Sequence, residues 1–419
     1  MSGFETLVKK CSTPVDYERL DAYYSGETHL DSLGVSLPPE VRVLEMSAMW
    51  PKLAVDVLVE SLVLEGFTSA TGDVPERLRP LLQANNFDTL WPLAMTEALV
   101  QRRAYIVVGP GDDPEWPLIT AHPAKGFAVR RDRMGGIAEA VRTYRVGKTE
   151  WAVHYEPGNA TYYRRVNGRW VRRDGWATGL DRVPVVELVN RVRLGDEGHS
   201  EISDIATLCD AASRSLTNLQ VAQELLAMPV RFLFGDGADE PQVDQDGRRV
   251  SKIEAYFGRL LTGPEGSTAG QIPGASLSEI IAAFKLYAQQ VSAMTGIPPF
   301  MMGISADSNP SSAEAMRSAK DRLITRAAVK QNQFGDAAED VARLVLAVAG
   351  ESTEGLQTLE ARWRDPAVAS PSARNALMLQ ANSQGVLSSE TTREFLGLSP
   401  EQAERENQLD ARTRQVTGG

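Results

Sequence analysis

The chain has little cysteine and histidine, with two cysteines and four histidines in 419 residues. Cys11 and Cys209 lie far apart, so we expect neither a disulfide framework nor a cysteine zinc site, and a reducing compartment is favoured. No histidine stands at metal-pair spacing from another, and none belongs to a recognisable nucleophile arrangement. These histidines are His29, His122, His154 and His199.

Long hydrophobic runs are also missing. No run approaches 18 apolar residues, and the opening MSGFETLVKK lacks the apolar core of a signal peptide. The composition, 42% hydrophobic and 24% charged, is that of a folded protein. We therefore expect a soluble, non-secreted protein without a membrane partner. The net charge of −11 argues against gripping nucleic acid through total charge, although a sliding contact with DNA stays open.

Complete catalytic motifs are absent as well. Gly147-Lys148-Thr149 resembles the end of a phosphate-binding loop, but Arg142 stands where that loop needs glycine, and the strand pattern EWAVHY follows. The acidic stretch 236–247 fails the spacing of a calcium loop, which leaves an exposed acidic loop or an unrelated divalent site. No G-x-S-x-G occurs. We therefore expect no enzyme, no catalytic or metal site and no cofactor.

The first half of the chain changes from helical to β patterns. Helical patterns occupy 41–101, with one from Met46 to Leu64, and an earlier helix-like stretch covers Tyr17–Tyr24. From 104 to 190, short β-branched and aromatic runs alternate with glycine turns, which predicts an antiparallel β-meander. Eleven arginines and lysines between Arg130 and Arg173 predict a solvated sheet face or a docking face.

Two narrow-striped helices bracket a small mixed module in the second half. Apolar residues recur at alternating 3 and 4 spacing in 201–228, and 277–295 is the second helix. Between them, 229–276 combines strand candidates with loops. This order suggests a stalk with a tip. Beyond residue 350 follow a strand candidate at 359–365 and two short helices, Ser372–Ala381 and Ser389–Phe395.

The most informative segment is 296–350. Gly296 and the prolines behind it end the preceding helix, and turn-forming residues fill 301–310. Ser311 and Glu314 form a capping box that begins a helix reaching Ala349, roughly 55 Å long at ~1.5 Å per residue. Basic residues fill its first half and acidic residues its second, which predicts a solvated face or complementarity between subunits. The basic residues are Arg317, Lys320, Arg322, Arg326 and Lys330.

Taken together, these features resemble the portal proteins of tailed bacteriophages, in particular the short portals of siphophages that infect actinobacteria. The resemblance extends across nearly the whole chain, and its motifs are specific as a linked set. Its carriers are YYSGETHL (23–30), PVVELVNRVRLGDEGHSEIS (184–203), GIPPFMMGISADSNPSSAEAMRSAKDRLITRAAVKQNQFG (296–335) and ARWRDPAVASPSARNALMLQANSQGVLSSETTREFLGLSPEQ (361–402).

The resemblance implies an α+β portal fold with named parts. Long helices combine with an antiparallel, β-rich portion of an outer wing, and a stem pair carries a distal clip. The implied parts are wing 1–200 (helices 41–101, β-meander 104–190), stem helices 201–228 and 277–295, clip 229–276, tunnel loop 303–311, long wing helix and strand 312–369, and small crown 370–419.

It also implies which residues do the work. The implied tunnel loop comprises Gly303, Ile304, Ser305, Ala306, Asp307, Ser308, Asn309, Pro310 and Ser311. Side chains close behind it that could reach DNA are Arg317, Lys320 and Arg322. The implied clip docking residues are Arg231, Asp236, Asp239, Glu240, Arg248 and Arg249.

The implied function is mechanical. Such proteins form rings of twelve subunits at one capsid vertex, built in the host cytoplasm, through which double-stranded DNA is packaged and ejected. The implied partners are the terminase large subunit, head-completion or connector proteins, and the major capsid and scaffolding proteins. Alternatives are another head-completion or capsid protein, or a DNA-packaging enzyme such as the motor ATPase, which would need a complete phosphate-binding loop.

Overall fold

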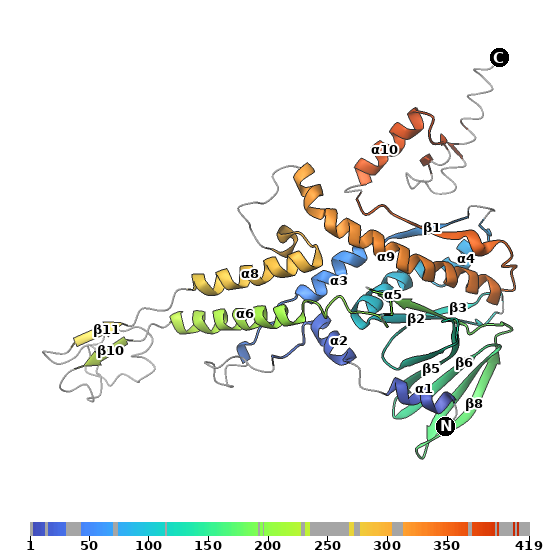
Figure 1. The fold of residues 1–419 in the computed structure, drawn as a ribbon, viewed down its shortest axis with the longest axis horizontal. Coiled ribbons are helices and arrows are strands. Elements are labelled where there is room, and N and C mark those ends of the chain that lie inside the picture. Colours follow the sequence, from blue (N-terminus) through green and yellow to red (C-terminus); the bar gives the residue numbers. More distant parts are fainter. Residues whose placement is uncertain are drawn as a thin grey trace.

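The computed structural model describes residues 3–12, 16–30, 43–69, 74–113, 115–191, 193–195, 197–227, 231–234, 268–271, 277–303, 313–367, 371–389, 392–393, 405–406 and 409. A body of helices and sheets carries two paired helices that project away from it (Figure 1). These are α6 (Ala206–Ala227) and α8 (Ser278–Thr295), which pack against each other. The short antiparallel strands β10 (Arg231–Phe234) and β11 (Thr268–Gln271) lie at their far end.

The predicted β-region is antiparallel, but it forms two sheets rather than one. The first has three strands in the order β3-β2-β9, and the second has five strands in the sequential order β4 to β8. Their bounds are β2 Arg103–Gly109, β3 Leu118–Pro123, β4 Phe127–Arg131, β5 Ile137–Val146, β6 Thr149–Glu156, β7 Asn159–Val166, β8 Arg169–Ala177 and β9 Val185–Val189.

Local turn chemistry explains the hairpins of the five-stranded sheet. Gly147, at φ 59°, turns β5 into β6, so the Gly-Lys-Thr sequence is a hairpin connection as its strand context predicted. Asn167 and Gly168 also have positive φ and connect β7 to β8. Of the eleven basic residues between Arg130 and Arg173, all except the half-buried Arg142 are exposed, as both a solvated face and a docking face require.

Five helices lie in the N-terminal part that the structure describes. Sequence reasoning missed the first, α1, which packs on β4 and β5 of the five-stranded sheet. The predicted helix Met46–Leu64 is wrong in its extent: α3 stops at Glu60, and Leu64 begins the strand β1. The bounds are α1 Gly3–Cys11, α2 Tyr17–Ser25, α3 Trp50–Glu60, α4 Leu78–Ala84, α5 Phe87–Gln101 and β1 Leu64–Ser69.

The reason for that error is a distant strand partner. β1 pairs antiparallel with β12 (Leu359–Trp363), which lies where a strand was predicted. A strand with one partner so far along the chain has only a weak local signal. The β1–β12 pair lies against α9, and a Cβ added at Gly335 of α9 would lie 3.3 Å from the Trp363 indole nitrogen of β12.

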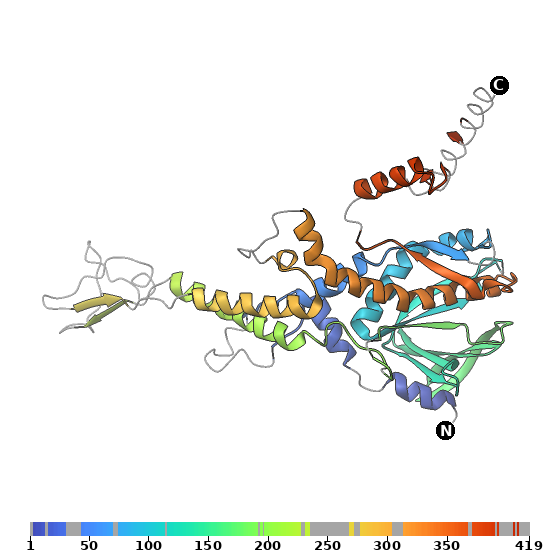
Figure 2. The same cartoon turned by 45° about the horizontal axis from the view of Figure 1, so that its top comes forward.

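The long helix is α9 (Ala313–Val348), 36 residues without a break. Its predicted apolar side is buried in the main core together with α3, α5 and β2. Phe334, Val341 and Val345 are fully buried there. Figures 1 and 2 show α9 crossing the body beside both α5 and the base of the paired helices. The helix therefore supports the body along its whole second half.

Shorter elements complete the described chain. The 3-10 helices are η2 (Pro299–Met302) and η3 (Leu356–Thr358), and α10 (Pro371–Ser383) matches the predicted helix Ser372–Ala381. Of the predicted helix Ser389–Phe395, residues 392–393 are helical and 390–391 and 394–395 lie outside the described residues. No described helix is both long and apolar enough to span a membrane.

Candidate functional site: the junction of the paired helices with the long helix

Both ends of the predicted tunnel loop start from one junction. Helix α8 ends at Gly296, whose φ of 75° and N–H bond to the Ser292 carbonyl form a left-handed cap, as predicted. After η2, Gly303 caps the chain again at φ 73°. Helix α9 begins at Ala313. The predicted loop residues 304–311 lie outside the described residues, so Gly303 alone of that set is placed.

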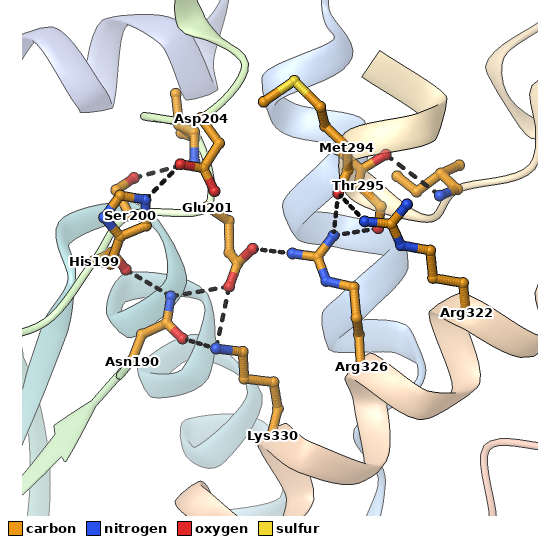
Figure 3. A network of polar contacts seen from close by, with 12 residues as sticks. Asn190, His199, Ser200, Glu201, Asp204, Met294, Thr295, Arg322, Arg326 and Lys330 are labelled. Atoms are coloured by element: carbon orange, nitrogen blue, oxygen red, sulfur yellow. Dashed lines mark hydrogen bonds and ion pairs between the residues drawn. The ribbon is translucent and has the colours of Figure 1, made fainter. Parts of the chain in front are cut away.

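Two arginines of α9 hold the end of α8. Arg322 donates to the carbonyls of Ala293 and Met294, the latter at 3.4 Å. Arg326, one turn later, donates to the Thr295 carbonyl. The last carbonyls of a helix lack partners and carry its negative dipole end, so cations here are favourable. Figure 3 shows both guanidinium groups converging on the end of α8.

A buried carboxylate joins the same arginine to the base of α6. Glu201, with its side chain 4% exposed, lies in the turns before α6 and pairs with Arg326 and Lys330 (Figure 3). The Lys330 ammonium lies 3.3 Å from Glu201 Oε1, and the Lys330 side chain is 5% exposed. The Glu201 backbone N–H donates to the Leu99 carbonyl of α5 at 3.0 Å. Through its backbone and its side chain, Glu201 therefore connects α5 and α9 at the base of α6.

Asn190 completes this network behind β9. Its amide nitrogen donates to Glu201 Oε1 at 3.1 Å and to the His199 carbonyl at 2.6 Å, and its oxygen accepts from Lys330. Asn190 is fully buried. Every polar group of the buried set thus has a partner, which is the condition under which such a network stabilises one arrangement.

The electrostatics of the network follow from burial and charge. Burial disfavours ionisation of Glu201, but Arg326 and Lys330 outweigh it and hold the pKa of Glu201 below its ordinary value. Burial lowers the pKa of Lys330, against the pull of Glu201. The group therefore stays an ion cluster at neutral pH, and it has no nucleophile or open ligand position for catalysis.

The solvated-face hypothesis for the basic half of α9 is wrong at Arg326 and Lys330. Both form ion pairs with Glu201 of the same chain. They stand at positions i and i+4 on one face of the helix, which brings the two cations beside this one buried carboxylate. Complementarity between subunits is not needed to explain them. The acidic half is also partly used internally, since Asp340 accepts a bidentate contact from Arg182 at 2.8 and 2.5 Å.

The structure places the remaining predicted site residues as follows. Lys320 is half-buried on α9, Arg322 contacts α8 as above, and Arg317 lies in the first turns of α9, where its side chain is outside the described set. Arg231 lies in β10. The other predicted docking residues, Asp236, Asp239, Glu240, Arg248 and Arg249, lie outside the described residues.

Sequence reasoning missed Glu201 and Asn190. The sequence feature that could have indicated a buried acidic partner was the spacing of Arg326 and Lys330. Like charges at i and i+4 of a helix repel each other, and a carboxylate placed between them removes that repulsion. Which of the 55 acidic residues supplies it is not written in the local sequence.

Comparison with known proteins identifies the architecture. The family model for phage portal proteins of the SPP1 Gp6-like type matches residues 15–414. The portal protein of Mycobacterium phage D29 is 35% identical over 405 residues, covering 92% of this chain and 82% of the relative. The portal protein of Mycobacterium phage L5 is 32% identical over 430 residues, covering 98% and 87%.

Solved structures share the fold at low identity. A chain of the neck of the native gene transfer agent particle, computed with C12 symmetry, aligns with a TM-score of 0.52 at 16% identity and covers 92% of this chain and 94% of its own. A chain from the virion of the same particle gives a TM-score of 0.51. Together with the family match, these findings favour the portal over the other head proteins and the packaging enzyme. The chain belongs to the phage portal protein family, and it is a structural protein of a portal ring at a capsid vertex, not an enzyme.

Proposed function

We propose that twelve copies of this chain close into a ring whose channel carries double-stranded DNA during packaging and ejection. The twelvefold count rests on the C12 symmetry of the gene transfer agent neck that shares this fold. A head-to-tail interface closes only when the rotation between subunits is right, and long helices give such an interface a large area.

The paired helices carry the assignment of parts. Residues 201–228 and 277–295 are the stem, 229–276 the clip, 1–200 and 312–369 the wing, and 370–419 a small crown. The supporting observation is the projection of α6 and α8 from the body with the β10–β11 pair at their far end (Figure 1). A tip held away from the body suits docking, since it exposes its surface to a partner.

Residues 303–311 form the tunnel loop in this proposal. The junction of Arg322, Arg326 and Glu201 fixes α8 to α9 close to where the loop starts. Asp307 is the one charged residue of the loop, and lysine and arginine are absent from it. A loop without cations would touch moving DNA without binding phosphates by counterion release. Arg317 and Lys320 on α9 are the residues behind it that would come closest to DNA.

The clip would meet the terminase large subunit during packaging and head-completion or connector proteins afterwards. Its mixed charges, from Arg231 to Arg249, offer salt-sensitive contacts to two successive partners. The wing would face the major capsid and scaffolding proteins. Assembly would take place in the host cytoplasm before the ring enters the virion.

The loop assignment is tested by deleting 304–310 in the phage. We expect rings to assemble, as seen by negative-stain electron microscopy, and packaged particles to lose full genome length because the moving DNA loses its contact at the channel wall. A glycine–serine segment of the same length is the matched control for chain connection. Full genomes packaged and retained by the deletion variant would refute the tunnel-loop role.

A further inference from the structure

Three ligating side chains meet on one face of the five-stranded sheet, far from the junction. Val141 of β5 is paired with His154 of β6. Side chains alternate between the two faces of a strand, so Glu139, two residues before Val141, and Glu156, two residues after His154, lie on the same face of the sheet as His154. One ligand atom from each of Glu139, His154 and Glu156 lies within 4.8 Å of the other two. This is also the face that α1 covers, through Phe4 and Leu7.

The facing atoms lack hydrogen-bond partners. His154 is 6% exposed, and its Nε2 and the Oε2 of Glu139 are both buried without such a partner. They face each other at 3.6 Å, which is too long for a hydrogen bond. At metal bonds of about 2.1 Å, tetrahedral ligands lie about 3.4 Å apart. The separation is therefore one that two ligands of one metal ion can have.

The surroundings prepare these groups to act as ligands. Arg130 donates to Glu139 Oε1 at 2.6 Å, which leaves Oε2 for the ion. Glu156 lies 3.5 Å from the other ring nitrogen of His154, and its side chain is 45% exposed. One ion binds only one nitrogen of an imidazole, so this exposed carboxylate would have to move towards the Nε2 side to complete the site.

The backbone of α1 makes room at the same point. A Cβ at Gly3 would lie 2.7 Å from Glu139 Oε2, so glycine is the residue that allows the carboxylate to stay aimed at His154. The Phe4 ring lies 5.4 Å from the His154 ring and shields the site from the α1 side.

We propose that Glu139, His154 and Glu156 bind a divalent zinc ion that clamps β5 to β6 beneath α1. An imidazole nitrogen with two carboxylates suits zinc, whereas magnesium and calcium prefer oxygen ligands alone. The ion would fix the platform on which the N-terminal helix rests, a structural role in the wing. This site is independent of the assignment of the tunnel loop and clip.

The test is metal binding to the assembled, tag-free ring after chelator treatment. Equilibrium dialysis against zinc should give one ion per subunit, and cobalt in its place should show the visible d–d absorption of a tetrahedral site. His154→Asn and Glu139→Gln should each abolish stoichiometric binding, while Glu156→Gln should weaken it ~10-fold. His199→Asn is the matched control, because His199 pairs with the single carboxylate of Asp204 at 2.7 Å.

Gly3→Ala is a second test of zinc binding, and it leaves all three proposed ligand residues unchanged. It should weaken zinc binding by displacing Glu139 while α1 stays helical, and zinc should raise the melting temperature of the natural protein but not of His154→Asn. Rings that bind no zinc, or that bind it equally in His154→Asn and His199→Asn, would overturn the proposal.

Discussion

A buried carboxylate is costly unless its charge is met, and at Glu201 two cations and one amide meet it. Two of these partners lie on α9 and the third, Asn190, directly follows β9, so the contacts of this side chain depend on the packing of α9 at the base of α6. Removing one member leaves the others buried and unpaired, which costs more than the pair itself contributes.

We therefore expect Glu201→Gln to lower the free energy of unfolding by about 3 kcal/mol, because Lys330 then keeps a buried charge without its counter-ion. Urea unfolding followed by circular dichroism measures the change. Asp204→Asn, on the exposed partner of His199, is the control and should change stability by less than about 0.5 kcal/mol. Equal effects of the two substitutions would show that the network contributes little.

His122 sets a pH dependence. Burial, with a smaller effect of Arg142, lowers the pKa of His122 to about 3, against an ordinary value of 6.5. Below pH 6.5 the unfolded chain takes up a proton that the folded chain refuses, so stability falls as pH falls. The loss by pH 4.5 is about 3 kcal/mol, at about 1.36 kcal/mol per pH unit.

The measurement is the unfolding free energy of the natural chain and of His122→Gln between pH 7 and 4.5. Glutamine preserves a polar partner for Thr120, which lies 3.0 Å from the His122 ring. The stability of the natural chain relative to that of His122→Gln should decrease as the pH falls, because glutamine does not titrate. Parallel curves would mean that the pKa of His122 is the same in the folded and the unfolded chain.

At the scale of elements, α9 both fills the core and caps another helix. Its apolar side packs into the main core, and Arg322 and Arg326 reach the last carbonyls of α8. Side chains of α9 that lie outside the core thus stabilise the C-terminal end of α8.

Arg322→Gln should therefore lower stability by about 1 kcal/mol, because the α8 carbonyls lose a charged donor near the surface. Thermal unfolding checks this at low and high salt, and the difference should shrink as salt screens the charge. Lys320→Gln, on another face of α9, should be near neutral. If Lys320→Gln lowered the stability more than Arg322→Gln, the contact between Arg322 and the α8 carbonyls would not be the stabilising one.

At the scale of the whole molecule, the projecting pair exposes apolar side chains. Ile281 and Leu286 of α8 are 41% and 53% exposed, and Met294 is 43% exposed. In a ring of identical subunits, such side chains on a long helix can be covered by the neighbouring stem.

We expect Leu286→Glu combined with Ile281→Glu to leave the subunit folded but to prevent ring formation, since charges would be buried between neighbours. Mass photometry counts the subunits, and circular dichroism checks the fold. Gln289→Glu, an exposed polar position on the same helix, is the control for added charge and should still give rings. Rings of unchanged size from the double variant would remove α8 from the subunit interface.

Local chemistry made much of the fold predictable from the sequence. Gly296 ends α8 and the glycine turns give the β5–β6 and β7–β8 hairpins, because left-handed backbone depends on the residue at that position. The long apolar side of α9 and the strand at 359–363 follow from residue periodicity. The portal family was also apparent from the sequence, since its motifs occur as a linked set.

The tertiary structure decided what depends on distant partners. The β1–β12 pairing turned the end of a predicted helix into a strand, and packing on the sheet made a helix of the polar segment α1. The pairing of Glu201 with Arg326 and Lys330 likewise joins parts of the chain that no local pattern relates. Contacts of this kind are determined by the path of the whole chain, because a charge or a strand edge selects its partner only once folding has brought the candidates together.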